Sequence, residues 1–241
     1  MPNKESTREI RHPLFSHLDI QQVFDPKVAF GEEEAEKLTK EALEVARDGF
    51  GSKMTYEDVF NHLIKDPDFT YIVKINNRLA GFASFCERKF PEGRALYLDG
   101  IVVRKNHQKD GIFRIINSLQ LEYGNYDFLT MRTQNPVIYG ATRKLKNIEA
   151  IFPNIPIMEC GAEIPADILN VANRTAEDLE MGGGINQRSF VGKGTYSHCL
   201  YEPMPYYEGV SEFFTGTLEM STDEGDSVVI VARVNHPGVS N

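Results

Sequence analysis

A basic stretch in the middle of the chain offers the clearest chemistry. The segment VVRKNHQKDGIFR (residues 102–114) lies between an apolar run and a helical pattern, and its ionisable residues other than Asp110 are all basic: Arg104, Lys105, His107, Lys109 and Arg114. Gly111 has no side chain, so a ligand can approach the backbone closely at the expected helix start. Amides at a helix N-terminus lack intrahelical partners and attract anions. The turn therefore predicts a phosphate-binding site, with a solvated basic surface loop as the alternative.

Two other phosphate motifs are excluded by their patterns. No GxGxxG follows an expected strand, which removes the dinucleotide-binding fingerprint. VGKGT, at residues 191–195, lacks both the upstream glycine and the Ser or Thr directly after lysine that a Walker loop requires. The basic turn at residues 104–111 is therefore the candidate phosphate site.

The elements that must position this turn follow from hydrophobic periodicity. We expect strands at residues 16–24, 69–75, 78–90, 95–103, 126–133 and 226–234, and helices at 31–50, 55–64, 111–123 and 135–148. This order predicts an α+β fold with a mixed central sheet flanked by helices.

Local signals support several of these boundaries. Thr55 and Asp58 resemble a capping box at a helix start. The pair Asn76-Asn77 is typical of a two-residue hairpin turn. Asn135 is followed by a proline, which is the order of a helix-capping residue and a first-turn proline.

Composition and charge limit the class of protein. The chain has 241 residues with 26 Lys and Arg against 35 Asp and Glu, a formal net charge of −9, which argues against a general binder of nucleic acid or anionic membranes. Three scattered cysteines (Cys86, Cys160 and Cys199) are too few for a disulfide framework or a CxxC metal site. Neither a secretory signal nor a membrane-length apolar run is evident, so we expect a cytoplasmic protein.

The texture of the chain changes near residue 150. Proline-rich and glycine-rich stretches follow, with four tyrosines close together at 196, 201, 206 and 207. We expect a flexible N-terminal arm at residues 1–17, a core at 18–150, an insertion at 151–207 and a C-terminal part at 208–241 that completes the sheet. The insertion would form a lid or the wall of an acceptor site.

The basic turn also resembles a known signature. Residues 108–113 (QKDGIF) are similar to the Q/R-x-x-G-x-G/A motif of the GNAT acetyltransferase superfamily. An apolar strand ends at Val103, five residues before Gln108, and a further strand leads into Asn135 after the helix. The order of elements over residues 18–150 resembles the GNAT fold, and the strand at 226–234 would supply its last strand.

The resemblance implies acetyl-CoA as co-substrate and implies no metal. In that family backbone amides of the signature loop bind the pyrophosphate, which here implies Gln108, Lys109, Asp110, Gly111, Ile112 and Phe113. The preceding strand pairs with the pantetheine arm, which implies Ile101, Val102 and Val103. An asparagine at the end of the next strand often bonds the same arm, which implies Asn135.

The sequence departs from the family pattern at three positions. Phe113 stands where the family usually has Gly or Ala, and Asp110 adds a negative charge that is tolerable only if its side chain points away from the phosphates. Thr142 stands about where the family places a tyrosine that protonates the departing thiolate. Tyr139, one turn earlier, is the candidate acid, with a core aromatic as the alternative.

Asp99 is the candidate base. A carboxylate inside the apolar run LYLDGIVV is costly unless it is paired or functional. Such a base would deprotonate an ammonium, and a backbone N–H near Val103 would polarise the thioester carbonyl. The alternative is a strand residue that faces the surface.

The resemblance thus implies an N-acetyltransferase that transfers acetyl directly, in a ternary complex, to an unidentified small amine or peptide. His198 and the nearby tyrosines would wall the acceptor site or pack an extra layer over the sheet. One rival is a catalytically inactive acyl-CoA-binding or interaction protein, which Phe113 and Thr142 favour. Another is an enzyme that uses a different acyl-CoA donor. The sequence leaves the oligomeric state open.

Overall fold

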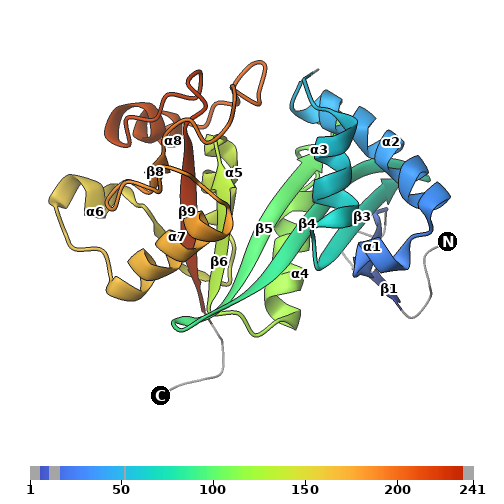
Figure 1. Ribbon diagram of the computed structural model, residues 1–241, viewed down its shortest axis with the longest axis horizontal. Helices are drawn as coiled ribbons and strands as arrows, with labels where there is room; N and C mark the ends of the chain where they lie inside the picture. Colours follow the sequence, from blue (N-terminus) through green and yellow to red (C-terminus); the bar gives the residue numbers. More distant parts are fainter. Residues whose placement is uncertain (1–5, 11–16, 52, 236–241) are drawn as a thin grey trace. The chain divides into compact units, whose positions relative to one another are not determined.

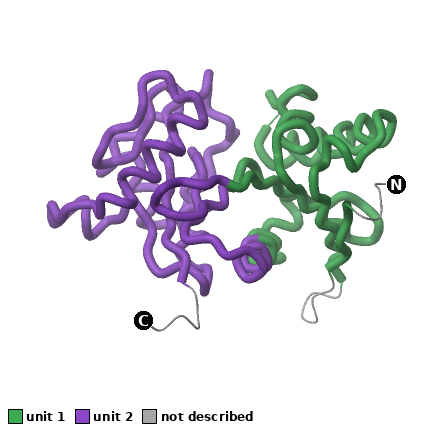
Figure 2. The backbone as a smooth tube through the Cα atoms, turned by 60° about the horizontal axis from the view of Figure 1, so that its bottom comes forward, with its two compact units in different colours: residues 1–87, 98–116 green, residues 88–97, 117–241 purple. Residues whose placement is uncertain are grey.

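The computed structural model describes residues 6–10, 17–51 and 53–235. These form two compact units, one from the described residues of 6–87 with residues 98–116, and the other from residues 88–97 and 117–235 (Figure 2). Strands β4 (Arg78–Phe90) and β5 (Gly93–Val103) and helix α4 (Ile112–Tyr123) are each divided between the units. Each unit is described in turn.

The first unit contains a sheet, the helices that lie between its second and third strands in the chain, and the start of a helix that follows its fifth strand (Figure 1). Its strands follow the order β1-β2-β3-β4-β5, and the pairs β1–β2, β2–β3 and β3–β4 are antiparallel. Besides β4, β5 and the start of α4, its elements are β1 (Thr7–Ile10), β2 (Asp19–Phe24), α1 (Pro26–Ala29), α2 (Glu32–Gly49), α3 (Tyr56–Phe60), the π-helical turn η3 (Asn61–Lys65), β3 (Phe69–Ile75) and the 3₁₀ turn η4 (Lys105–His107).

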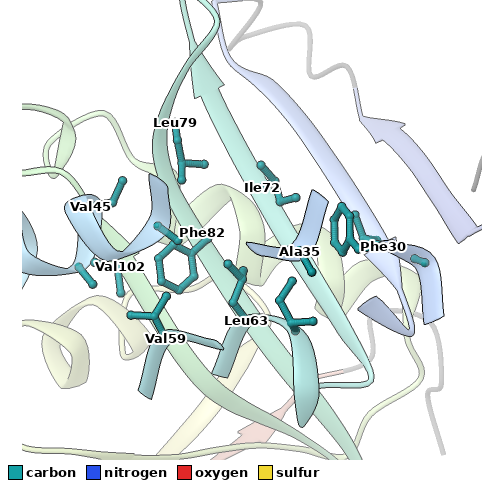
Figure 3. Close-up of a cluster of buried hydrophobic side chains, with 14 residues drawn as sticks. Phe30, Ala35, Val45, Val59, Leu63, Ile72, Leu79, Phe82 and Val102 are labelled. Atoms are coloured by element: carbon teal, nitrogen blue, oxygen red, sulfur yellow. The ribbon is translucent and has the colours of Figure 1, made fainter. Parts of the chain in front are cut away.

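One apolar cluster holds these helices against the strands (Figure 3). Val45 of α2, Val59 of α3 and Leu63 of η3 are each at most 2% exposed. They pack with Phe82 of β4 and Val102 of β5. Burial of apolar side chains from both layers, each contributing roughly 1.5–3 kcal/mol, thus fixes η3 relative to the end of β5.

The local signals of this unit are confirmed. Thr55 accepts a hydrogen bond from the backbone N–H of Asp58, and the Asp58 carboxylate accepts one from the N–H of Thr55, a complete capping box. Asn76 and Asn77 have φ of 51° and 60°, as a type I′ hairpin turn requires between β3 and β4.

The second unit is organised around the buried strand β9 (Ser227–Val234). It pairs antiparallel with β6 (Phe128–Thr133) on one side and with β7 (Ile148–Phe152) on the other, and β8 (Val191–Gly192) also pairs with it. The remaining elements are α5 (Pro136–Thr142), α6 (Ile155–Cys160), α7 (Ala166–Asp178), α8 (Val210–Glu212) and the π-helical turn η5 (Phe213–Thr217). Together the units confirm the α+β class with helices flanking a sheet.

Three parts of the chain differ from expectation. The helix after Asn135 ends at Thr142, because the amides of Lys144 and Leu145 bond three residues back rather than four, to Ala141 O and Thr142 O at 3.1 Å each. Ile148 instead starts β7, paired with Val234. Residues 7–10 of the expected arm form β1, while residues 1–5 and 11–16 lie outside the described ranges. Helix α7 was not predicted.

The division of the chain at residues 17, 150 and 207 stays a prediction. Among the helices described, none combines the length and the apolar character that crossing a membrane requires.

Candidate active site

Three hydrogen bonds anchor the turn that follows β5 in the first unit. The backbone N–H of Arg104 donates to Ala80 O at 2.8 Å, and its Nε donates to Leu79 O at 2.8 Å. The N–H of Lys105 donates to Oδ2 of Asp48, at the end of α2, at 2.8 Å. The position of the turn is therefore set by both β4 and α2.

A glycine allows β4 to approach the end of β5 at this point. A Cβ at Gly81 would lie 2.6 Å from the carbonyl oxygen of Val102. Because the obstructing atom belongs to the backbone, it cannot move aside as a flexible side chain would. Any larger residue at position 81 would push Val102 and Val103, two of the predicted cofactor-binding residues, out of place.

Side chains then close the turn on itself. Gln108 Nε2 donates to the carbonyl oxygen of Val103 at 3.2 Å, which ties the turn back to the strand end. Asp110 Oδ2 lies 2.8 Å from Nδ1 of His107. The carboxylate of Asp110 is thus directed at an imidazole of the same turn, which is the arrangement under which its negative charge is tolerable beside an anion.

The start of α4 is open to a ligand. Gly111 has φ of +76°, a conformation that favours glycine, and the atom nearest to a Cβ there would be Arg114 Nη2 at 3.7 Å. The first intrahelical bond runs from Ile115 N–H to Gly111 O at 3.0 Å, so the amides of Ile112 and Arg114 precede the helical ladder. Four cations of this stretch are exposed or half-buried: Arg104, Lys105, Lys109 and Arg114. Arg104 Nη2 lies 3.9 Å from Glu44 Oε2.

Asp99 lies on β5 four residues before the strand ends. Its side chain is 12% exposed, and Oδ2 is 3.2 Å from Nδ1 of His62 on η3. Among the described residues, Oδ2 makes no hydrogen bond. A buried polar atom without a hydrogen bond costs about 1–3 kcal/mol, so Asp99 is not a surface-facing strand residue but a carboxylate held in a partly desolvated position.

In the second unit, Asn135 caps α5. Its Oδ1 accepts a hydrogen bond from the N–H of Val137 at 2.9 Å, and its own N–H donates to Oγ1 of Thr133 at 2.9 Å. The side chain also hydrogen-bonds the hydroxyl of Tyr201. Burial raises the pKa of Tyr201 well above its usual range, although the hydrogen bond with Asn135 acts in the opposite direction. This hydroxyl therefore stays protonated at neutral pH.

Tyr139 is a core residue of the second unit. It is 1% exposed, its hydroxyl donates to Pro153 O at 2.8 Å, and its ring packs against Phe213 and Phe214. Burial raises the pKa of Tyr139 to about 12. The hydroxyl proton is engaged by a carbonyl, and these contacts are those of the core aromatic that was weighed against a catalytic acid. Tyr139 as acid stays a prediction.

The position of the family's tyrosine holds a buried side chain. Thr142 is fully buried, and its Oγ1 donates to Ile138 O at 2.9 Å, one turn back on α5. Hydroxyl donation to the carbonyl four residues earlier is the usual local use of a helical threonine. Thr142 therefore supplies no acid in the place of the tyrosine.

Residues of the expected insertion lie along the end of β6. Arg132 is 4.3 Å from the ring centroid of Tyr196, and the N–H of Leu200 donates to Gln134 Oε1 at 2.9 Å. His198 Nδ1 is 2.7 Å from Oγ of its neighbour Ser197. These contacts hold residues 196–201 close to Asn135, where they form a layer over one strand end.

The predicted residues are thus distributed over two units. Asp99, Ile101–Val103 and residues 108–113 form one continuous stretch of the first unit, and Asn135 and Tyr139 lie one turn apart in the second. Sequence reasoning missed His62 beside Asp99 and singled out Tyr201 only as one of four clustered tyrosines. The one sequence signal for His62 was its own position among the apolar residues of 59–64.

A comparison with protein families gives one match. Residues 35–116 match the family described as "Acetyltransferase (GNAT) family". The matched segment runs from α2 into α4 and contains His62, Asp99, the turn and Gly111. No curated protein matches the chain.

Similar solved structures are distant in sequence. A putative acetyltransferase from Pyrococcus horikoshii is 14% identical with a TM-score of 0.43, over 60% of this chain and 48%, about half, of its own length. The ribosomal-protein-S18-alanine N-acetyltransferase from Escherichia coli is 10% identical with a TM-score of 0.45, over 92% of this chain and 98% of its own. The ribosomal-protein-alanine N-acetyltransferase from Brucella melitensis is 18% identical with a TM-score of 0.35, over 47% and 79%. Over residues 35–116, the chain is thus similar to the GNAT acetyltransferase family.

Proposed function

We propose that the protein transfers acetyl from acetyl-CoA to an amine in a ternary complex. The observation that carries the proposal is the turn at residues 104–111, within the matched segment. There a glycine precedes α4 in a stretch that contains Arg104, Lys105, Lys109 and Arg114, although the chain has a net charge of −9, and Arg114 Nη2 would lie 3.7 Å from a Cβ at this glycine. Helix-start amides and local positive charge are what a pyrophosphate requires.

The turn fits acetyl-CoA as co-substrate in two further respects. Apart from its chain neighbours, the atom nearest to a Cβ at Gly111 would be Arg114 Nη2 at 3.7 Å, which leaves space for phosphate oxygens on that side of the glycine. The one carboxylate of the turn, on Asp110, is paired with His107. We assign the pyrophosphate to residues 108–113 and the pantetheine arm to the backbone of Ile101, Val102 and Val103.

The reaction needs positioning and proton transfer from the protein. The amine nitrogen attacks the thioester carbonyl carbon, so that a C–N bond forms and the C–S bond breaks. Asp99 takes the proton that the ammonium must lose before attack. As the C–S bond breaks, the nitrogen loses its second proton to solvent, and the departing CoA thiolate takes a proton from solvent. A backbone N–H near Val103 stabilises the developing oxyanion. Tyr139 and Thr142 are both buried and hydrogen-bonded, so neither hydroxyl is available to protonate the thiolate. We therefore assign that proton to solvent.

The acceptor is a small amine or a peptide. A chain of net charge −9 attracts cationic acceptors at long range, although this effect is screened by salt.

A second candidate function is acyl-CoA binding without catalysis. The buried Thr142 and the bulky Phe113 favour it, since one removes the family's acid and the other widens or distorts the loop. The two functions are separated by incubating the protein with acetyl-CoA and a panel of amines: a polyamine, an aminoglycoside and a peptide with a free N-terminus. Acetylated product identified by mass spectrometry supports the transferase. Binding without product supports the second candidate, and longer acyl-CoA donors tested on the same panel define the donor.

A further inference from the structure

A histidine faces the candidate base from another element of the first unit. His62 Nδ1 lies 3.2 Å from Asp99 Oδ2, although the two residues are far apart in the sequence. The two side chains do not meet by chance at the surface, because the carboxylate of Asp99 is largely buried. Oδ2 of Asp99 has no hydrogen bond among the described residues, so the imidazole is the group best placed to exchange a proton with it.

The fold holds the imidazole in place. His62 belongs to η3, a π-helical turn, and such turns occur frequently at functional sites. Its neighbours Leu63 and Ile64 are buried in the same cluster as Val102, three residues beyond Asp99 (Figure 3). The core that packs η3 on β5 therefore fixes the distance between the imidazole and the carboxylate.

The two side chains differ sharply in exposure. The Asp99 side chain is 12% exposed and that of His62 is 47% exposed. A proton taken up by a desolvated carboxylate needs a route to water before the next turnover. An imidazole has two nitrogens, so it can accept a proton on one and release one from the other, and its ordinary pKa lies close to neutral pH.

We propose that His62 and Asp99 form a proton relay, which rests on the proposed acetyl transfer. The proton that the ammonium loses passes to Asp99. It then passes from the carboxyl to Nδ1 of His62, and Nε2–H releases a proton to solvent, which restores the carboxylate and leaves a neutral imidazole protonated on Nδ1. Before the next turnover the imidazole gains a proton on Nε2 from solvent and loses the one on Nδ1 to solvent, which restores its starting tautomer. His62 acts through Asp99 and is a positioning and relay residue, whereas Asp99 meets the substrate.

The test is kinetic and uses the full-length protein. His62→Ala, His62→Gln and Asp99→Asn are assayed with acetyl-CoA and the fastest amine of the panel, and acetylated amine is quantified by mass spectrometry. Lys65→Ala is the control, because Lys65 is exposed on the same π-helical turn. We expect both His62 variants to lower kcat at least about 10-fold, with unchanged KM for acetyl-CoA. Glutamine keeps a hydrogen-bond donor but cannot relay a proton, so it should not rescue.

Two further measurements separate a relay from a structural role. Added imidazole should restore acetylation of the amine by His62→Ala but not by Asp99→Asn. The double variant should be no slower than Asp99→Asn alone, because the two residues act in series. All variants should melt within a few degrees of the wild type.

The outcomes distinguish the two proposals. Normal kcat in His62→Ala with an active wild type overturns the relay and leaves the transferase intact. Equal loss of kcat in Lys65→Ala, or rescue by glutamine, also overturns the relay. A wild type that neither binds acetyl-CoA nor acetylates any amine overturns the transferase and the relay together.

Discussion

The polar residues at the end of β5 and those at the start of α5 are used in opposite ways. At α5, Asn135 caps the helix, Tyr139 donates to Pro153 O and Thr142 donates to Ile138 O. On β5, Asp99 has a carboxylate oxygen that makes no hydrogen bond among the described residues and lies 3.2 Å from the imidazole of His62, and the amides of Ile112 and Arg114 precede the helical hydrogen bonds of α4. The first set is hydrogen-bonded within the fold, and we propose that the second serves binding and proton transfer.

This difference indicates where in the chain functional polar groups are to be sought. Buried polar groups in folded proteins are nearly always paired, and a region that leaves groups unpaired loses stability unless a ligand or a reaction uses them. On this criterion we propose that the first unit carries the phosphate site and the base. In the second unit Tyr139 contributes to stability, and Tyr201 is a protonated hydroxyl next to Asn135.

The largest expected effect is on cofactor binding. Gly111→Glu puts a side chain at φ of +76° and a negative charge where phosphates would lie, so we expect the affinity for acetyl-CoA to fall at least about 100-fold, or roughly 2.7 kcal/mol. Isothermal titration calorimetry measures it. Gly111→Ala is the matched control, because it brings the same backbone strain, about 1 kcal/mol, without the charge. Equal affinity in Gly111→Glu and the wild type would remove the assignment of the turn.

The second effect is on turnover. Asp99→Asn keeps the shape of the side chain but cannot accept the ammonium proton, so we expect kcat to fall about 100-fold. The affinity for acetyl-CoA should be unchanged, because the residue is not part of the turn. Steady-state kinetics with the best amine of the panel checks both values. Full activity in Asp99→Asn would eliminate Asp99 as base.

Tyr139→Phe tests whether the polar groups at the start of α5 serve stability rather than catalysis. The variant loses the hydrogen bond to Pro153 O, which should cost about 0.5–1.5 kcal/mol of unfolding free energy, while kcat changes less than about 3-fold, below the contribution of a general acid. A loss of kcat of tenfold or more would instead make Tyr139 the acid.

The same variant has a signature in alkaline solution. Burial raises the pKa of Tyr139 to about 12, above its ordinary value of 10.0. As the pH rises above 10, the unfolded chain therefore loses this proton while the folded chain keeps it, and stability falls. Denaturant unfolding of both proteins from pH 9 to 11 should show a smaller loss in Tyr139→Phe.

The smallest effect concerns the carboxylate within the turn. Because Asp110 is directed at His107, Asp110→Asn should change the affinity for acetyl-CoA less than about 3-fold, as expected for a screened surface charge. The same titration measures it. A tenfold gain in affinity would mean that the carboxylate repels the phosphates and that the turn is poorly suited to them.

Local signals predicted much of the fold. The Thr55–Asp58 capping box, the Asn76-Asn77 turn and the Asn135 cap all involve residues within three positions of each other, and all are present. Ile148 was wrongly placed on a helix because its partner, Val234, lies at the far end of the chain. Pairing between distant strands outweighed the local helical period there.

The candidate site likewise contains residues that a local pattern predicted and contacts that no local pattern could predict. The turn and Gly111 are contiguous with the strand before them, so a pattern of a few residues was enough to predict them. The approach of His62 to Asp99 depends on how η3 packs on β5, and that of Tyr201 to Asn135 on how residues 196–201 return to β6. Such contacts between distant segments have no local signature.

The most direct test of the central claim is the melting temperature with and without saturating acetyl-CoA. Ligand at about a hundredfold its dissociation constant stabilises the folded state by roughly 2.7 kcal/mol, which for a chain of this size is a rise of about 5–10 °C. A rise of that size in the wild type, absent in Gly111→Glu, is the predicted result. No rise at millimolar acetyl-CoA would contradict the account, since the turn after β5 would then bind no cofactor.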